Sequence, residues 1–301
     1  MSKLNICIIG LGLIGASLGL AIKKHLQNDV YIIGIDKAIV TTNFAVENNF
    51  VDYASNLIDE NIKKADIVFL CTPVLQIVPM VEKILPYLKT NAILSDVGST
   101  KAFIWSKLQS VLPMDIDYVA GHPMTGSEQS GIEAANADLF RNKCYILVPE
   151  TDKKTESVTQ INDLLKIIGA NITTMGIEEH DSVAAAISHV PHVVAAGLVN
   201  ILGSSEDDVE NKLKLAGGGF KDTTRIASSN SDMWADICMS NADNIINDLE
   251  KLQSLIGDVK SVRPQHVTSK QIIEKTAKYF DLSSRDITSA RRDKFITEPR
   301  Q

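Results

Sequence analysis

The sequence predicts an α/β domain built on a mostly parallel sheet, followed by an all-α helical domain. Short apolar runs alternate with helical patterns through the first half of the chain, and this alternation stops near Pro149. The second half consists almost entirely of helical patterns. Strands that are apolar along their whole length are typical of parallel sheets covered by helices on both faces. We therefore expect a sheet domain over 1–150, a helical domain over 151–260, and a basic helical tail over 261–301.

The predicted elements follow one another along the chain. Apolar runs predict strands over 4–9, 30–36, 65–73, 91–99, 117–124 and 142–149. Helical spacing predicts helices over 16–25, 41–49, 75–88 and 101–111, with a weak element near 55–58. The second half is predicted to hold a short strand-like segment over 170–175 and helices over 155–168, 179–203, 222–228, 232–257 and 268–279.

The composition excludes several classes of protein. Of the 301 residues, 45 % are hydrophobic, which excludes a disordered or collagen-like chain. The formal net charge of −7 disfavours a protein that binds nucleic acid over its whole surface. Four widely spaced cysteines fit a reducing, cytoplasmic location. The uncharged run from Leu4 to Ile22 contains four glycines, which favours a strand, a turn and a helix over a membrane span.

A glycine pattern after the first strand predicts a dinucleotide site. The pattern is Gly10-x-Gly12-x-x-Gly15. Gly10 permits a tight turn, Gly12 lets the backbone approach a pyrophosphate, and Gly15 allows close helix–strand packing. Asp36 ends the second strand, where its carboxylate can accept hydrogen bonds from ribose hydroxyls and would repel a 2′-phosphate. We therefore predict a Rossmann-type domain that binds NAD. The other predicted cofactor contacts are Leu13, Ile14, Thr72, Pro73, Asp96 and Val97.

Five further motifs occur in a fixed order. They are SDVGSTK (95–101), GHPMTGSE (121–128), HVPH (189–192), GGGFKDTTR (217–225) and the pair MW (233–234). As a set, they make residues 4–258 closely resemble the prephenate and arogenate dehydrogenase family of tyrosine biosynthesis. The resemblance implies an oxidative decarboxylation in which NAD takes a hydride from the ring carbon that bears the 4-hydroxyl, CO₂ leaves and the ring becomes aromatic. It also implies a homodimer, with residues 151–260 as the substrate and dimerisation domain.

The resemblance implies roles for individual residues. His122 matches the family's catalytic histidine, and a neutral imidazole suits a group that accepts the hydroxyl proton. Ser99 matches a serine that bonds the same hydroxyl, and it can also cap the following helix. Arg225 matches the arginine that binds a substrate carboxylate, for which its forked guanidinium is suited. The other predicted substrate residues are Glu128, His189, His192, Gly218, Lys221, Asp222 and Trp234.

Some of these assignments leave an alternative open. His189 can instead fill or cap the interior, Trp234 can belong to the core, and Asp222 can lie on a solvated helix face, as can Glu128. His189 and His192 have the spacing of a metal-binding pair, but no third ligand is evident and the chemistry needs no metal, so we expect none. The surface is the expected location of the remaining histidines, His25, His180 and His266.

Three other functions stay open. The substrate can be arogenate, in which an amino group replaces the side-chain keto group. A β-hydroxyacid dehydrogenase of similar plan would need a lysine as base, and Lys221 is the candidate. A non-enzymatic NAD-responsive regulator is suggested only by the tail, because residues 260–301 hold 10 Lys and Arg against 5 Asp and Glu. Residues 268–301 resemble the start of the DNA-binding domain of the bacterial replication initiator, but we favour a solvated tail and expect neither nucleic acid nor membrane as partner.

Overall fold

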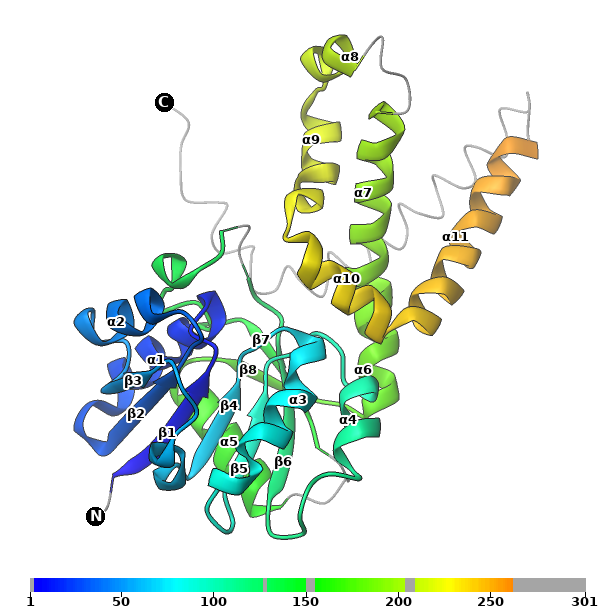
Figure 1. Ribbon diagram of the computed structural model, residues 1–301. Helices are drawn as coiled ribbons and strands as arrows, with labels where there is room; N and C mark the ends of the chain where they lie inside the picture. The colour runs from blue at the N-terminus through cyan, green and yellow to red at the C-terminus, as the bar shows by residue number, and fades with distance from the viewer. Residues whose placement is uncertain (1–2, 127–128, 150–154, 204–208, 262–301) are drawn as a thin grey trace, which may run out of the picture. The chain divides into compact units, whose positions relative to one another are not determined.

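The structure, a computed structural model, describes residues 3–126, 129–149, 155–203 and 209–261. The chain divides into two compact units, 1–246 and 247–301. An eight-stranded sheet forms the centre of the first unit (Figure 1), with the strand order β3-β2-β1-β4-β5-β6-β7-β8. Its strands are β1 (Leu4–Ile9), β2 (Val30–Ile35), β3 (Tyr53–Ser55), β4 (Ile67–Leu70), β5 (Ile93–Asp96), β6 (Asp117–Pro123), β7 (Cys144–Val148) and β8 (Asn171–Thr174).

Helices cover both faces of this sheet, which confirms the predicted fold class (Figure 1). Successive side chains of a strand point to opposite faces, so Ile6 and Ile8 of β1 pack in one core cluster while Cys7 and Ile9 pack in the other. One cluster includes residues of α1 (Leu13–Leu26), α2 (Ile39–Glu47) and α5 (Glu156–Ile167). The other includes residues of α3 (Val74–Ile84) and α4 (Ala102–Leu108).

The strands β1 to β6 pair in parallel, whereas β7 pairs antiparallel with β6. In the described part of the connection between β6 and β7, the only helix is the short η4 (Ile132–Ala134), so no long crossover helix separates the two strands. The chain then passes through α5 to β8, which lies parallel to β7 at the sheet edge. The sheet therefore continues past the expected boundary at residue 150, as far as Thr174. The sequence of β8, NITT, is largely polar because an edge strand is partly solvated.

Helices follow β8, as the sequence predicts. From Ile177 to Gly203 the chain is continuously helical, through α6 (Ile177–Ala184), a π-helical turn η5 (Ala185–His189) and α7 (Val190–Gly203). Pro191 has no backbone N–H and its ring crowds the preceding turn, which accounts for the wider turn just before it. The remaining elements are α8 (Val209–Leu215), α9 (Gly218–Thr224), η7 (Arg225–Ser228), α10 (Ser231–Ser240) and α11 (Ala242–Ser261).

Two predicted helices have different bounds in the structure. The helix expected over 222–228 begins at Gly218, with Gly217 at its N-cap, so the glycine segment is the start of a helix rather than a loop. The helix expected over 232–257 is interrupted at Asn241, whose φ of −131° is not helical. Its buried side chain makes tertiary hydrogen bonds, which local periodicity does not reveal. The helix predicted over 268–279 lies outside the described residues.

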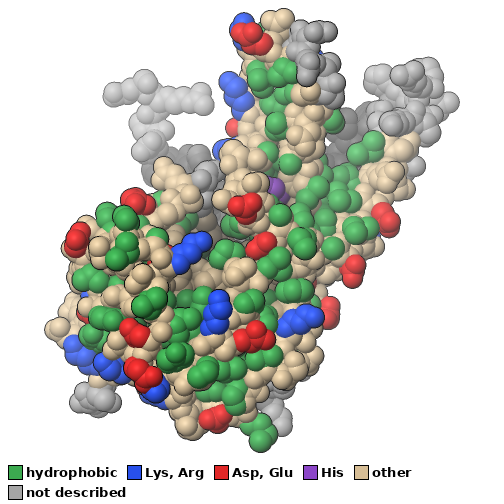
Figure 2. Space-filling view, in the orientation of Figure 1, with side chains coloured by type: hydrophobic (Ala, Val, Ile, Leu, Met, Phe, Trp, Pro, Cys, Tyr) green, Lys and Arg blue, Asp and Glu red, His purple; other side chains and the backbone are tan. Residues whose placement is uncertain are grey.

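The helical segment Ile177–Gly203 presents much apolar surface. A window of it has a mean hydropathy of 1.6 and is 28 % buried, so by length and composition alone it could span a membrane. Figure 2 shows hydrophobic side chains along the helices drawn at the top of the view. The exposed large hydrophobic side chains of this segment are Val183, Ile187, Leu198, Val199 and Ile201. Exposed apolar side chains gathered on one helical segment favour an interaction site.

Candidate active site

The glycine turn lies at the point where the strand order reverses. From β1 the chain moves to β2 and β3 on one side and then returns to β4 on the other, so the carboxyl ends of β1 and β4 form a crevice. Gly10 has φ +95°, and a Cβ there would lie 2.5 Å from the carbonyl oxygen of Cys71. At Gly15 a Cβ would lie 2.0 Å from the carbonyl oxygen of Gly10. A Cβ at Gly12 would meet nothing within 4 Å, so the space beside the turn is open there.

Asp36 and Thr72 flank this turn. The two carboxylate oxygens of Asp36 accept hydrogen bonds from the backbone N–H groups of Leu11, at 2.9 Å, and Ala38, at 2.9 Å. The half-buried Asp36 is thus tied to the glycine turn. The hydroxyl of Thr72 is buried without a partner among the described residues. Of the other predicted cofactor residues, Leu13 and Ile14 begin α1, Pro73 precedes α3, and Val97 follows β5.

Asp96 has a different environment from the one expected for a cofactor contact. Its side chain is fully buried and accepts hydrogen bonds from the Tyr118 hydroxyl at 2.7 Å and from the backbone N–H of Gly98 at 2.8 Å. It also forms an ion pair with the buried ammonium group of Lys101. Lys101 Nζ donates in addition to the carbonyl oxygen of Gly121 at 2.6 Å. The carboxylate of Asp96 therefore links β5 to β6 inside the domain. Its ion pair with Lys101 stabilises the carboxylate in this buried position.

Replacing Lys101 with Met is expected to lower the free energy of unfolding by about 3–5 kcal/mol, because it leaves the Asp96 carboxylate buried without its counter-charge. Urea unfolding followed by circular dichroism measures this change. Lys107→Met, at an exposed position on α4, the helix that Lys101 precedes, is the matched control and should change stability by less than about 0.5 kcal/mol. Equal stabilities for the two variants would contradict the role given to Lys101.

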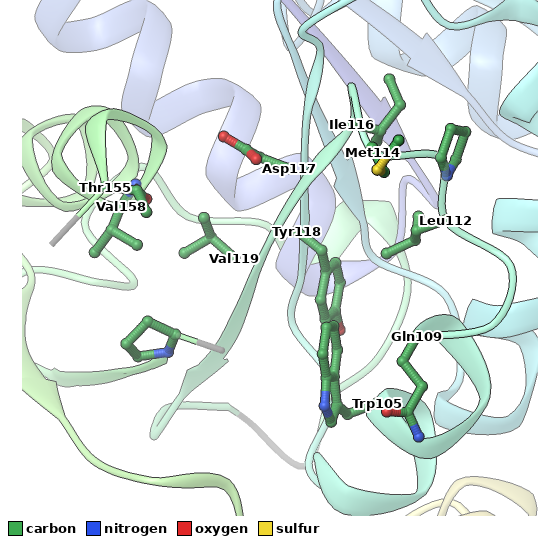
Figure 3. A pocket seen from close by; sticks show the side chains of 12 residues that line it. Trp105, Gln109, Leu112, Met114, Ile116, Asp117, Tyr118, Val119, Thr155 and Val158 are labelled. Atoms are coloured by element: carbon green, nitrogen blue, oxygen red, sulfur yellow. The ribbon is translucent and has the colours of Figure 1, made fainter. Parts of the chain in front are cut away.

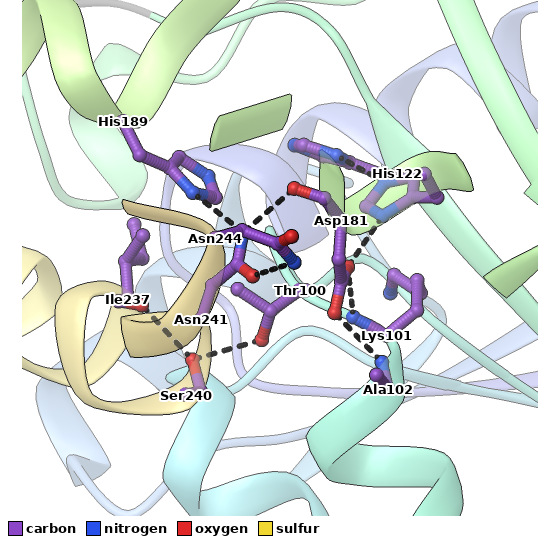
Figure 4. Close-up of polar contacts among 12 residues, drawn as sticks. Thr100, Lys101, Ala102, His122, Asp181, His189, Ile237, Ser240, Asn241 and Asn244 are labelled. Atoms are coloured by element: carbon purple, nitrogen blue, oxygen red, sulfur yellow. Dashed lines mark hydrogen bonds and ion pairs between the residues drawn. The ribbon is translucent and has the colours of Figure 1, made fainter. Parts of the chain in front are cut away.

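His122 is the first member of a buried polar chain (Figure 4). Its Nδ1 lies 2.9 Å from Nε2 of His180, and Nδ1 of His180 lies 2.7 Å from Oδ1 of Asp181. The same carboxylate accepts from the backbone N–H groups of Lys101 at 2.8 Å and Ala102 at 2.9 Å, at the start of α4. His122 is 8 % exposed, whereas His180 and Asp181 are 0 % and 1 % exposed. This chain of hydrogen bonds thus joins β6, α6 and the start of α4.

His180 is the residue that the sequence interpretation missed. It was expected at the surface, yet it is fully buried and bonded to His122. The one available signal was the neighbouring Asp181, because a carboxylate next to a histidine can orient its ring. That signal is weak in sequence, since the histidine that His180 contacts lies 58 residues earlier.

Burial determines the charge state of His122, His189 and His192. Burial, together with the nearby charge of Lys101, lowers the pKa of His122 well below its usual value of 6.5. Burial lowers the pKa of His189 to about 4 and also lowers the pKa of His192. These three imidazoles are therefore neutral at neutral pH, and a neutral imidazole can accept a proton.

The two histidines of the HVPH motif lie beside Trp234. The ring of His192 stacks on the Trp234 indole with a centroid distance of 3.4 Å and an interplanar angle of 9°. His189 meets the same indole edge to face at 6.1 Å. The imidazole of His189 also makes a polar contact: its Nδ1 lies 3.2 Å from Nδ2 of Asn241. His189, His192 and Trp234 therefore lie in one cluster, which supports grouping them as predicted.

The predicted anion-binding residues lie on α9 and η7. Gly218, Lys221 and Asp222 are exposed on α9, and Arg225 begins η7. Both elements pack against α7, the helix that carries His192. Ser99 is half-buried in the loop between β5 and α4, next to Thr100, whose hydroxyl donates to the Ser240 hydroxyl at 2.9 Å. Glu128 lies outside the described residues.

A separate pocket of about 290 Å³ lies between α4, β6 and the start of α5 (Figure 3). Trp105 and Tyr118 stack at its wall with a centroid distance of 6.1 Å. None of the predicted site residues lines it. In the described part of the chain, no group of three or more His, Cys, Asp or Glu side chains is arranged to hold a metal ion.

A glycine turn at the switch point of a parallel sheet is where dinucleotides bind, and a neutral buried imidazole on the same edge can take a proton while a hydride leaves a substrate. These features define a dinucleotide-dependent oxidoreductase with a helical second domain. The comparisons with known proteins narrow this class. Residues 18–174 match the family described as prephenate dehydrogenase, nucleotide-binding domain, and residues 177–280 match prephenate dehydrogenase, dimerization domain. The chain belongs to the prephenate dehydrogenase family.

Individual relatives agree with this membership. The chain is 39 % identical over 262 residues to a prephenate dehydrogenase of Bacillus subtilis, covering 87 % of this chain and 70 % of that protein. It is 35 % identical to a cyclohexadienyl dehydrogenase of Zymomonas mobilis, covering 84 % and 88 %. A crystal structure of prephenate dehydrogenase from A. aeolicus with hydroxyphenyl propionate and NAD+ superposes with a TM-score of 0.85 at 28 % identity, covering 95 % and 99 %. An arogenate dehydrogenase of Synechocystis has a TM-score of 0.79 at 28 % identity, covering 93 % and 100 %.

Proposed function

We propose that this chain catalyses the NAD-dependent oxidative decarboxylation of prephenate to 4-hydroxyphenylpyruvate. The observation that carries the proposal is the buried chain from His122 through His180 to Asp181, because it determines which nitrogen of His122 can accept a proton. Family membership and the prephenate dehydrogenase of Bacillus subtilis support the choice of substrate.

The tautomers of His122 and His180 follow from the carboxylate of Asp181 at the end of this hydrogen-bonded chain. The carboxylate of Asp181 only accepts hydrogen bonds, so Nδ1 of His180 carries a proton. We assign the neutral form to His180, whose Nε2 then accepts a hydrogen bond that Nδ1 of His122 donates. The lone pair of the neutral His122 consequently lies on Nε2. His122 is held as a base whose free nitrogen can take the proton of a substrate hydroxyl.

Charge movement in the reaction explains why such a base is needed. NAD, when bound in the crevice, would supply the acceptor for the hydride of the ring carbon that bears the 4-hydroxyl. Positive charge then develops at that hydroxyl, and His122 Nε2 stabilises it by accepting the proton. The carbon–carboxylate bond breaks, CO₂ leaves, and its electron pair makes the ring aromatic. We assign Ser99 to a hydrogen bond with the same hydroxyl, since it lies half-buried in the loop after β5.

Observed features of the crevice fit NAD. The open space beside Gly12 and the uncapped start of α1 suit a pyrophosphate, since that first turn contains no acidic residue to repel it. We assign Asp36 to the ribose hydroxyls and Thr72 to a polar group of the cofactor, which would satisfy its unpaired hydroxyl. Leu13, Ile14, Pro73 and Val97 are assigned to the crevice walls. Asp96 is assigned to the interior of the domain instead.

Prephenate is a dianion, so its pocket needs positive charge. We assign Arg225 to a substrate carboxylate, with Lys221 adding positive charge on the same side of the helical domain. Asp222, one turn before Arg225, and Glu128 are assigned to an ionic network with that arginine. We further assign the backbone at Gly218 and the stacked rings of His192 and Trp234 to the pocket wall.

Arogenate is the second candidate substrate, because the chain resembles both cyclohexadienyl and arogenate dehydrogenases. A β-hydroxyacid dehydrogenase is not favoured. A 3-hydroxyisobutyrate dehydrogenase of Salmonella typhimurium shares the fold at a TM-score of 0.57 but only 10 % identity. Its mechanism would need Lys221 as base, and Lys221 is an exposed residue of α9.

We also propose that the chain forms a homodimer in the cytoplasm. The match to a dimerization domain and the exposed apolar side chains of Ile177–Gly203 support the dimer. The same segment carries the buried polar residues His180 and Asp181, which favours a second copy over lipid as the partner of its apolar surface. The cysteines Cys7, Cys71, Cys144 and Cys238 are free thiols, in keeping with a reducing compartment.

An absorbance assay of NADH or NADPH formation tests the proposal directly. Prephenate and arogenate are each offered with NAD or with NADP. We expect turnover with prephenate and NAD, and a weaker reaction with NADP because the carboxylate of Asp36 would repel the 2′-phosphate. A preference for arogenate would favour the second candidate, and an absence of turnover with either substrate would contradict both.

A further inference from the structure

Asn241, at the break between α10 and α11, connects the polar chain of His122 to His189 (Figure 4). Its side chain is 5 % exposed. Nδ2 donates to the backbone carbonyl oxygen of Asp181 at 2.8 Å and lies 3.2 Å from Nδ1 of His189. Oδ1 accepts from Nδ2 of Asn244 at 2.8 Å. Every polar atom of this amide is therefore used.

These contacts determine the tautomer of His189. A backbone carbonyl oxygen only accepts, so the amino group of Asn241 must face Asp181. The second hydrogen of that amino group points to Nδ1 of His189, which must accept it. His189 is neutral because burial lowers its pKa to about 4, so its single ring proton is carried by Nε2.

The Nε2–H group of His189 has no partner among the described residues and is buried. The indole N–H of Trp234, whose ring lies 6.1 Å from that of His189, is also buried without a partner in the described part of the chain. Buried donors in native proteins are nearly always satisfied, so two adjacent unpaired donors indicate a missing acceptor. Both groups are donors only, so an oxygen atom of a molecule bound beside them would satisfy them.

We propose that Nε2 of His189 donates a hydrogen bond to a carboxylate or carbonyl oxygen of the substrate, and that Asn241 is the positioning residue that keeps the proton on this nitrogen. The inference rests on the proposed function, since prephenate carries two carboxylates and a keto group. A donor with a determined tautomer suits such a ligand, because the alternative tautomer would turn a lone pair toward its oxygens.

Variants of His189 test the substrate contact. His189→Leu removes the donor and should raise KM for prephenate about 10- to 100-fold, the cost of losing one hydrogen bond to a charged group, with KM for NAD unchanged. His189→Gln can place an amide N–H near the position of Nε2, whereas His189→Asn places it near Nδ1. We therefore expect Gln to recover part of the loss and Asn not to. If the Asn variant had a KM for prephenate equal to or lower than that of the Gln variant, the assignment of the donor to Nε2 would be overturned.

Asn241→Leu tests the positioning role, and Asn244→Leu is its control because Asn244 contacts only Oδ1 of Asn241 among the bonds described. Two-bond ¹H–¹⁵N spectra of the full chain labelled in histidine report the tautomer without any substrate. We expect the Nε2–H form of His189 in the wild type and in Asn244→Leu, and a mixture with raised KM for prephenate in Asn241→Leu. A wild-type Nδ1–H form would overturn the role of Asn241.

Binding of hydroxyphenyl propionate, measured by calorimetry in the presence of NAD, separates this inference from the proposed function. Wild type that binds the probe without turning over prephenate would contradict the proposed function alone. Equal affinities of wild type and His189→Leu for the probe, with equal KM for prephenate, would overturn the inference alone. Failure of the wild type to bind the probe would contradict both.

Discussion

Replacing His122 with Asn is expected to lower kcat for prephenate by about 10²- to 10⁴-fold, the usual contribution of a positioned general base. The asparagine side chain is shorter and cannot take up a proton at neutral pH. The charge that develops on the substrate hydroxyl as the hydride leaves would then be left without an acceptor. Steady-state kinetics with saturating NAD measure the effect, and the affinity for NAD should be unchanged because the glycine turn and Asp36 are untouched.

The control is His25→Asn, an exposed histidine in the last turn of α1. It should retain wild-type kcat. Turnover by His122→Asn equal to that of the wild type would contradict the histidine mechanism, provided that both proteins bind NADH with the same affinity by fluorescence.

The pH dependence of the wild type gives a second readout of the same base. Only the neutral form of His122 can accept a proton, so activity is lost as pH falls through its pKa. Burial and Lys101 lower that pKa, and the acid limb of kcat/KM is therefore expected below pH 6.5. An acid limb near pH 7 or higher would contradict a neutral, buried His122.

The second prediction concerns His180. Replacing it with Phe is expected to lower kcat about 10²-fold with little change in KM for prephenate or NAD. Without an acceptor at Nδ1, His122 can carry its proton on Nε2, and in a comparable histidine held by a carboxylate the wrong tautomer costs up to about 10⁴-fold. His180→Gln should recover most of the activity, because its amide oxygen can accept from His122 Nδ1 as Nε2 of His180 does.

Rescue by Gln distinguishes positioning from a merely structural role, since both replacements remove the imidazole. Glu178→Gln, at an exposed position on the same helix α6, serves as the surface control. Thermal unfolding of each variant shows whether it is folded at the assay temperature. Equal loss of kcat in the Phe and Gln variants, with both folded, would contradict the proposed tautomer chain.

Much of the fold could be predicted because its signals are local. The apolar strands, the helices and the glycine turn all leave short-range patterns, and β1, β2, β4, β5 and β6 lie where strands are predicted, whereas β3 coincides only with the weak element near 55–58. The antiparallel direction of β7 and the inclusion of β8 could not be predicted in the same way. Strand direction depends on how a connection packs, and β8 contributes a polar edge that resembles a loop in sequence.

The site shows the same division. His122, His192 and Trp234 belong to motifs that are legible in the sequence. Asp96 also belongs to a motif, but its motif does not indicate that Lys101 would hold its carboxylate in the interior. A sequence pattern specifies which side chain is present at a position, whereas its partner is specified by the packing of distant elements.

By itself, the sequence determined the α/β class, the dinucleotide crevice, the family and the identity of the proposed base. The tertiary structure alone decided that His180 is buried against His122, that Asn241 bonds both Asp181 and His189, and which nitrogens therefore carry protons. The physical reason is range. Periodicity and turn chemistry act over a few residues, while these hydrogen bonds join residues 52 to 60 positions apart that meet only when α6 and α10 have packed on the sheet domain.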